Sequence, residues 1–500
     1  MTQPSRSRAL RALLPILPSP RARRRPLRLR PSRTSHRATG GTRSYLPVLL
    51  VGALVWQGCQ DAQNPVDEPS QPEVHRQDEP SAPGAVLPGT DPEAFAEAEE
   101  AFGAVEEIDE GLGPIFNERG CASCHTTPVA GGSGEQFERR FGTFVNGEFF
   151  AYDRDPDNHG GTLRQLMTVG TYATEAGQVC EIPLEVEPAD ATVNNVGRRT
   201  QPLFGLGLVD AMPDRFFESL ARSQDRDVRG VVQYVPVALP DPRDPSQSIG
   251  SMRVGRFGWK GQVPSLLQFS GDAYTNEMGI TTQSCFRGET ILAFAFENFP
   301  NNVPPPEGCQ GGDLAPLQPA HQDVPEFADD VVGPCDGDLT EIQDDLILFA
   351  LFMESQAPPP RDRGDNSWER REVERGEGVF EEVGCADCHV STTFVTPRNP
   401  FNGVPGRYRF QPYSDFLAHD MGALGDRIGN TGNSEKTTRL MRTQPLWGAR
   451  FNTTFLHDGR VADIPSAILE HDGQAERARR RFERLRRPEQ EALVRFVLSL

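Results

Sequence analysis

The first 58 residues lack acidic residues and lysine altogether, whereas they contain twelve arginines. They also lack an apolar run long enough to cross a bilayer. The run from Tyr45 to Trp56 has twelve residues, and a spanning helix needs about 20. An arginine-rich stretch before a short apolar run is typical of an export signal. We therefore expect residues 1–58 to be a leader and the mature protein to be periplasmic.

The sequence around Cys59 is similar to a lipoprotein cleavage site, because Gly58 precedes the cysteine just past the apolar run. Trp56 and Gln57 depart from the usual pattern, which favours leucine three residues before the cysteine, so an ordinary cleaved signal is the alternative. With lipid on Cys59, the protein would be anchored to a membrane. Residues 59–92 are proline-rich and acidic with few apolar side chains, which predicts a disordered tether.

Positive charge is scarce beyond residue 58, where 39 lysines and arginines stand against 71 acidic residues, a net charge of −32. A body this acidic is poorly suited to phosphate backbones, so we expect no nucleic-acid partner. It suits a basic redox partner, such as a small cytochrome or a cupredoxin. Solubility alone is the plainer explanation of the same charge.

Two CxxCH motifs carry the chemistry, and their residues are Cys121, Cys124, His125, Cys385, Cys388 and His389. No strand–helix–strand pattern of a thioredoxin-like thiol pair surrounds them, and a zinc site would need a second pair of ligands for each CxxC. In a c-type haem site the two thiols bond to the vinyl groups of one porphyrin, and the adjacent histidine binds the iron. We therefore predict two covalently attached c-type haems with His125 and His389 as proximal ligands. Zinc and a redox disulfide are the alternatives.

The two motifs belong to an internal repeat. Its paired segments are FNERGCASCHT (116–126) with FEEVGCADCHV (380–390), and RTQPLFG (199–205) with RTQPLWG (442–448). Two homologous modules are the simple interpretation. We predict two cytochrome-c-like haem domains in tandem. The N-terminal domain spans residues 93–360 and carries a long insertion, and the C-terminal domain spans residues 361–500.

The predicted fold class is mainly α-helical, with long irregular loops and short strands. Helices are expected over 93–102 (EAFAEAEEAF) and over Thr340–Gln356, where Thr340 and Gln343 form a capping box. A helix-like stretch is also expected before each CxxCH motif. Short strands are expected in segments such as VRGVVQYVPVAL (228–239).

Four further cysteines lie between the two CxxCH motifs, namely Cys180, Cys285, Cys309 and Cys335. In an exported protein this even number predicts two disulfides, with three pairings open. Reactive free thiols are the alternative.

The sixth ligand of each iron decides whether a di-haem protein only moves electrons or also reacts with a small molecule. In the C-terminal module, Asp463 is expected to cap a helix that has Pro465 in its first turn. Ile464, Ile468 and His471 then share one helical face, at i, i+4 and i+7. A histidine on an apolar face is more often a core residue than a ligand, but this one shares a small module with a haem motif.

Several motifs accompany the two CxxCH sites: RTQPLFGLGLVDAMPD, GRFGWKGQ, EMGIT, SDFLAHDMG, RTQPLWG, FLHDGR and AILEHDGQA. In this combination the chain resembles the bacterial di-haem oxidoreductases, a family labelled peroxidases or, loosely, thiol oxidoreductases. That family is related to the di-haem cytochrome c peroxidases and to the di-haem enzyme that matures methylamine dehydrogenase. The resemblance covers about residues 100–500 and implies a di-haem oxidoreductase of the peroxidase type.

The resemblance implies that His471 is the distal ligand of the second haem, because it stands one short helix beyond the HDG motif. Met421 is the second candidate, and His419 and Met441 are further ones. His457 of FLHDGR is expected to form a hydrogen bond near a propionate or a loop carbonyl.

The resemblance also implies an electron relay at Trp259, with a buried structural indole as the alternative. Arg199 and Arg442 stand at equivalent places in the repeat and are candidates to neutralise haem propionates. Arg256 and Lys260 are weaker candidates for that role, since an ordinary surface pair would look the same.

The N-terminal module lacks a histidine equivalent to His471, because aligning RTQPLFG on RTQPLWG places Val228 there. His159 is the nearby histidine, and the other candidate ligands are Met167, Met212 and Met278. An open iron in this module would react with hydrogen peroxide or another oxidant, with electrons supplied through the second haem. The sequence does not identify the acid that would deliver protons. The rival is a di-haem electron-transfer cytochrome, with both irons six-coordinate and no substrate.

Overall fold

The structure is a computed structural model. It describes residue 77 and residues 82–108, 112–152, 161–173, 179–280, 282–286, 289–294 and 344–500. Residues 70–500 form one compact unit, to which all of these belong. The predicted leader, Cys59, His159, and the side chains needed for the predicted disulfides lie outside the described part. The boundary between the two predicted haem domains stays a prediction.

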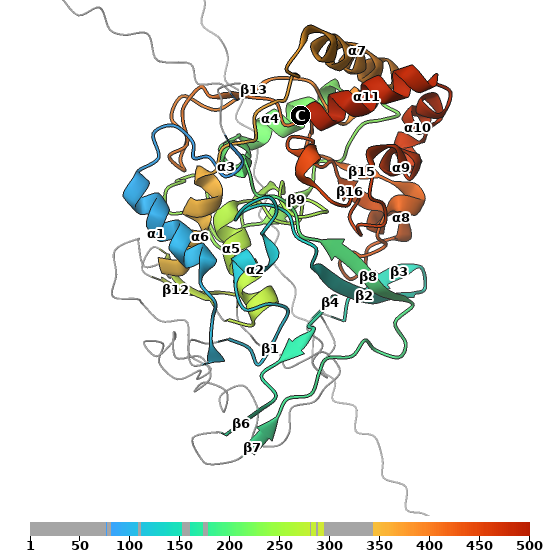
Figure 1. The fold of residues 1–500 in the computed structure, drawn as a ribbon. Coiled ribbons are helices and arrows are strands. Elements are labelled where there is room, and N and C mark those ends of the chain that lie inside the picture. The colour runs from blue at the N-terminus through green and yellow to red at the C-terminus, as the bar shows by residue number, and fades with distance from the viewer. Residues whose placement is uncertain are drawn as a thin grey trace, which may run out of the picture. The chain divides into compact units, whose positions relative to one another are not determined.

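Three helices lie side by side (Figure 1) and contribute to the main apolar core. Helix α1 (Pro92–Gly103) confirms the predicted first helix, and Asp91 caps it by accepting a hydrogen bond from the Glu93 N–H at 2.9 Å. Helix α5 (Leu266–Met278) and α1 both pack against α6 (Asp344–Ser355), where the Phe102 and Phe352 rings stack 4.2 Å apart. Helix α6 lies within the helix predicted over 340–356. Its predicted capping box lies outside the described residues.

The first CxxCH motif begins a short helix of its own, α2 (Cys121–Cys124). The helix expected directly before it is wrong, because β1 (Ile115–Phe116) stands there and pairs with β5 (Met167–Thr168). The physical reason is Gly113, whose φ of +90° belongs to the region that favours glycine, followed by Pro114. Together they prevent a helix from running into the motif.

The strands are short, and most of them pair two by two. One larger antiparallel sheet is centred on β2 (Phe137–Val145), which pairs with β3 (Glu148–Phe150), β4 (Leu163–Arg164) and β8 (Val193–Arg199). The remaining pairs are β6 (Thr171–Ala173) with β7 (Val179–Glu181), β9 (Tyr234–Pro236) with β10 (Met252–Val254), β11 (Thr282–Phe286) with β12 (Glu289–Phe294), β13 (Phe394–Val395) with β14 (Arg409–Phe410), and β15 (Ala418–Asp420) with β16 (Leu440–Arg442). The strand expected within 228–239 is thus β9 alone. The fold is mixed helix and short strand rather than mainly α-helical.

The second CxxCH motif does follow a helix, as expected. Helix α7 (Ser367–Val383) is capped by Asn366 and ends at Gly384, one residue before Cys385. It packs closely against α11 (Arg487–Ser499), and their shared apolar cluster includes Val373, Phe380, Leu493 and Phe496. The other α-helices in the described residues are α3 (Leu206–Asp210), α4 (Asp214–Ser223), α8 (Glu435–Thr438), α9 (Ile464–Leu469) and α10 (Glu476–Glu483).

The end of the predicted tether is packed rather than disordered. Leu87 is 2% exposed in the main apolar core, and its N–H donates to the Ser355 carbonyl at 2.8 Å. Gln77 donates through its side chain to the Pro359 carbonyl at 3.1 Å. The folded body therefore includes residues 82–91, ahead of the expected start at Pro92. Among the described residues, no helix is both long enough and apolar enough to cross a membrane.

Candidate haem-binding cavity

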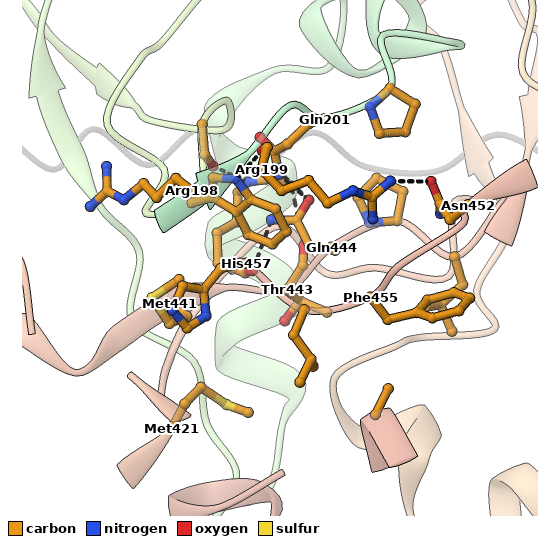
Figure 2. A pocket seen from close by; sticks show the side chains of 18 of the residues that line it. Arg198, Arg199, Gln201, Met421, Met441, Thr443, Gln444, Asn452, Phe455 and His457 are labelled. Atoms are coloured by element: carbon orange, nitrogen blue, oxygen red, sulfur yellow. Dashed lines mark hydrogen bonds between the residues drawn. The ribbon is translucent and has the colours of Figure 1, made fainter. Parts of the chain in front are cut away.

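Both CxxCH motifs and both RTQPL segments line one cavity of about 610 Å³. Its walls include Cys124, His125, Cys385, Cys388 and His389 (Figure 2 shows 18 of the lining residues from close by). The volume lies within the usual range for cofactor and ligand pockets, about 300–1,000 Å³. The tertiary structure thus brings together motifs that the sequence separates by more than half of the chain.

The two histidines of the motifs are oriented in the same way. His125 Nδ1 lies 3.1 Å from the Gly132 carbonyl oxygen, and His389 Nδ1 lies 2.9 Å from that of Tyr413. A carbonyl only accepts, so each Nδ1 carries a proton. For His389 this leaves the lone pair on Nε2, whereas the His125 imidazole forms a second hydrogen bond, with the backbone of Gln201. Burial lowers the pKa of both imidazoles to about 4, which keeps them neutral. Nε2 of His389 is therefore prepared to bind a metal, and His125 would bind one in place of its contact with Gln201.

His471 also lines the cavity, and its Nδ1 is also held by a backbone carbonyl. It lies just beyond α9, whose N-cap Asp463 accepts from the Ser466 N–H at 2.8 Å as the sequence predicts. Its Nδ1 donates to the Ala467 carbonyl at 2.7 Å, and burial lowers its pKa. Ile464, Ile468 and His471 all line the cavity, so the predicted common face is confirmed. The pKa of His389 is lowered chiefly by burial, and His471 contributes to the lowering.

His419 is not free to be a ligand. Its Nε2 lies 2.9 Å from Asp415 Oδ2, and its Nδ1 lies 3.6 Å from Cys388 Sγ. Burial alone would lower the pKa of this imidazole, but its hydrogen bonds to Asp415 and Cys388 raise it to about 10. Both ring nitrogens are engaged, so the candidacy of His419 as a distal ligand is wrong.

The methionine candidates separate into two groups. Met421 and Met441 line the cavity, and Met441 Sδ lies 3.8 Å from Lys260 Nζ. Met212 and Met278 are buried in the apolar core, and Met167 packs against it on β5, so none of these three lines the cavity. They are wrong as ligand candidates for the first haem. Val228, the residue aligned with His471, does line the cavity.

Two arginines supply the clearest test of whether a haem fits. Arg199 donates to Asn452 Oδ1 at 2.7 Å (Figure 2) and to the Thr454 carbonyl, while its buried Nε has no partner. Arg442 donates to the carbonyls of Gly258 and Thr443 and to Gln444 Oε1.

Among the described residues, neither arginine forms an ion pair with a carboxylate, although both are at most 6% exposed. Burial lowers the pKa of Arg199 to about 10 and that of Arg442 to about 9. Buried cations are normally paired, so this wall is suited to a ligand that brings its own carboxylates. The two propionates of a haem meet that requirement.

Trp259 connects the two RTQPL segments. Its indole N–H donates to the Arg199 carbonyl at 2.8 Å, and its own carbonyl accepts from the Arg442 N–H at 2.9 Å. Its ring meets that of His457 edge-on, with centroids 6.3 Å apart. The indole is thus a wall residue of the cavity, held between the two halves of the repeat.

Two other propionate candidates are wrong. Arg256 is fully buried away from the cavity, where it pairs with Asp214 and donates to the Met212 carbonyl at 2.5 Å. Lys260 is held by Asp426 at 2.8 Å and by the Thr438 carbonyl. Arg256 is paired with Asp214 and Lys260 with Asp426, so neither cation needs a propionate as its partner.

A carboxyl cluster beside the first motif was missed from the sequence. Glu138, Asp272 and Glu277 line the cavity, and Arg140 donates to Glu138 at 2.8 Å. Burial raises the pKa of Asp272 to about 6 and that of Glu277 to about 7. Glu277 accepts from the Asn117 side chain at 2.8 Å, and its charge helps to raise the pKa of Cys124. Glu277 stands in the EMGIT motif, but that motif gave it no role.

Two half-buried CxxCH motifs on one cavity, with two arginines in its wall that have no carboxylate partner, are typical of a redox protein that holds two haems. A family model described as "Di-haem oxidoreductase, putative peroxidase" matches residues 181–302 and 318–500. These residues make up more than half of the chain, and the protein belongs to this family.

No curated protein matches the chain significantly. Among solved structures, a xenon-pressurized hydrazine synthase from Kuenenia stuttgartiensis is similar at 12% identity, over 92% of this chain and 100% of that one, with a TM-score of 0.32.

Proposed function

We propose that this protein is an exported di-haem c-type oxidoreductase of the peroxidase type. It would reduce hydrogen peroxide or another small oxidant with electrons from a redox partner protein. The observation that carries the proposal is the single cavity lined by both CxxCH motifs and by the two arginines without carboxylate partners. The proposed attachment residues are Cys121, Cys124, Cys385 and Cys388.

Three histidines of the cavity would hold the irons. His125 and His389 would bind them next to the attachment cysteines, and His471 would bind the iron at His389, since the Nδ1 atoms of all three are held by carbonyls. When bound, the two haems supply electron storage and an iron that reacts with the oxidant. At the place equivalent to His471, the first half offers Val228, which cannot bind iron. This difference favours the haem at His125 as the reactive one.

The carboxyl cluster supplies the proton chemistry that the sequence left unassigned. Reduction of a peroxide requires proton transfer at its two oxygens. Glu277, whose pKa is raised to about 7, would take up and return that proton. Arg140 neutralises Glu138, so the cluster does not carry three uncompensated charges.

Trp259 is the proposed relay residue between the two sites, because its indole and its backbone contact both repeat arginines. The partner is proposed to be a basic cytochrome or cupredoxin, on the strength of the acidic body. Lipid on Cys59 would keep the enzyme at the periplasmic membrane, close to such donors.

The test is an EPR and absorption spectrum of the purified holoprotein, oxidised and half-reduced. One high-spin haem, especially one that develops on half-reduction, would support an open iron and a peroxidase. Two low-spin haems at every redox level would instead establish the rival function, a di-haem electron-transfer cytochrome. If acid and organic solvent extract the haem from the protein, the cysteines are not bonded to it.

A further inference from the structure

A buried ion pair adjoins the second haem motif and has no role in the proposed reaction. His419 is 2% exposed and Asp415 is fully buried. The imidazole stands between Asp415 Oδ2, 2.9 Å from Nε2, and Cys388 Sγ, 3.6 Å from Nδ1. The three ligand-type atoms all lie within 4.8 Å of one another.

Once Cys388 is bonded to haem, the donors and acceptors around His419 determine which of its ring nitrogens carry protons. A thioether sulfur has no hydrogen and can only accept, and a carboxylate also only accepts. Both oxygens of Asp415 act as acceptors, since Oδ1 accepts from the Leu417 N–H at 2.9 Å and Oδ2 accepts from the Gln224 amide at 2.6 Å. Both nitrogens of His419 therefore face acceptors, and both must carry protons. The side chain is an imidazolium.

Segments from far along the chain hold the pair in place. Gln224 accepts from the Gly230 N–H at 2.9 Å while it donates to Asp415. A Cβ on Gly230 would lie 2.7 Å from His419 Nε2, so this approach requires glycine. The N–H of Val231 donates to the Ala418 carbonyl at 2.8 Å, which ties the same loop to β15. A histidine needed only to fill space would not require this support.

We propose that His419 is a positioning residue that holds a positive charge against the Cys388 sulfur and thereby raises the reduction potential of the haem attached there. The inference rests on the proposed covalent haem. A nearby cation stabilises the reduced form, which carries one positive charge fewer, and a buried site screens this interaction weakly. Asp415 keeps the cation in place and limits its effect. Loss of His419 would leave the carboxylate alone within 4.8 Å of the sulfur.

The experiment is a spectroelectrochemical titration of the holoprotein, with EPR to assign each wave to its haem. His419→Gln should move the wave of the second haem to lower potential and leave the first wave unchanged. The double variant His419→Gln/Asp415→Asn removes both charges and should recover part of the shift in potential. It leaves no buried unpaired charge, so the protein should fold more readily than the single variant. Glu354→Gln is the matched control, because Glu354 is 1% exposed, pairs with Arg243 and does not line the cavity.

An unchanged second wave in His419→Gln, with both haems still bound, would overturn the inference. Equal shifts of both waves, or the same shift in Glu354→Gln, would also overturn it, because these results indicate general loosening of the fold. If the reduction potential of the second haem in the double variant is equal to or lower than that in His419→Gln, a charge effect is excluded. If the unaltered protein binds no covalent haem, the proposed function fails as well, and its absorption spectrum alone distinguishes that case.

Discussion

His471 owes its expected role to a single hydrogen bond, from Nδ1 to the Ala467 carbonyl, which leaves Nε2 directed at the cavity. We predict that His471→Ala opens the sixth position of the second iron. The EPR signal of that haem should change from low spin to high spin, and the first haem should not change. His457→Ala is the control, because His457 is a buried histidine of the same cavity. A second haem that stays low spin would point to Met421 as the ligand.

Glu277 gives a pH prediction at the same scale. Burial raises the pKa of this carboxyl to about 7, so the basic carboxylate is scarce below that pH and abundant above it. The rate of the peroxide step should therefore rise with pH through this region. Glu277→Gln should slow the step by roughly 10²–10⁴-fold and abolish the rise.

Stopped-flow kinetics at several pH values would measure both effects. Glu118→Gln is the control, since Glu118 also lines the cavity and its charge also raises the pKa of the Cys124 thiol. A pH profile that survives in Glu277→Gln would remove this residue from the proton chemistry.

At the scale of elements, α7 and α11 pack so closely that one position of α7 tolerates no side chain. A Cβ on Gly376 would lie 2.0 Å from the Ala492 carbonyl oxygen, whereas a Cβ on Gly378 would meet nothing within 4 Å. Gly376→Ala should lower the free energy of unfolding by about 1–3 kcal/mol through overpacking. Gly378→Ala should raise it by up to about 1 kcal/mol, because alanine is the better helix former. Urea unfolding of both variants would check the contrast, which equal effects would contradict.

Local sequence was sufficient for the elements whose signals lie within a few residues. The caps of α1 and α9, at Asp91 and Asp463, are side chains that bond to the backbone two or three residues later. The stretch before Cys121 differs from its repeat partner before Cys385, which is helical. Gly113 and Pro114 carry the local signal against a helix there.

At the scale of the whole molecule, Asp426 ties the two halves of the chain together. It accepts two hydrogen bonds from Arg198, the shorter at 2.7 Å, and one from Lys260 at 2.8 Å. Burial alone would raise the pKa of this carboxyl, but the two cations hold it well below its usual range. Its stabilising contribution is therefore present at neutral pH and is lost as acid protonates it.

Asp426→Asn should destabilise the fold by about 3–5 kcal/mol at pH 7, since it leaves buried Lys260 without a carboxylate and leaves Arg198 with only Glu138, 4.0 Å away. The loss relative to the unaltered protein should shrink in strong acid. Chemical unfolding at several pH values measures it, and Asp458→Asn, a half-exposed neighbour of His457, is the control. An effect below about 1 kcal/mol would mean that the network is not structural.

Trp259 belongs to the same scale, because it contacts both repeat segments. Trp259→Phe removes the indole N–H bond to the Arg199 carbonyl but keeps an aromatic ring. We expect slower electron transfer between the haems, measured by flash reduction of the oxidised protein, and a stability loss of only about 0.5–1.5 kcal/mol. Trp368→Phe is the control, because Trp368 is 52% exposed on α7. Unchanged transfer would leave Trp259 a purely structural residue.

The sequence by itself determined the chemistry that consecutive residues carry: the CxxCH motifs, the repeated RTQPL segments, and the helix that ends before His471. These signals are local, because covalent attachment and helix capping depend on spacing within one or two turns. Only the tertiary structure decided which side chains meet across the chain. In the folded chain both ring nitrogens of His419 have partners, Arg256 lies away from the cavity, and Asp272 and Glu277 lie beside the first motif. Such outcomes depend on burial and on partners that other elements supply, such as Cys388 for His419 and Asp214 for Arg256, and no local pattern specifies them.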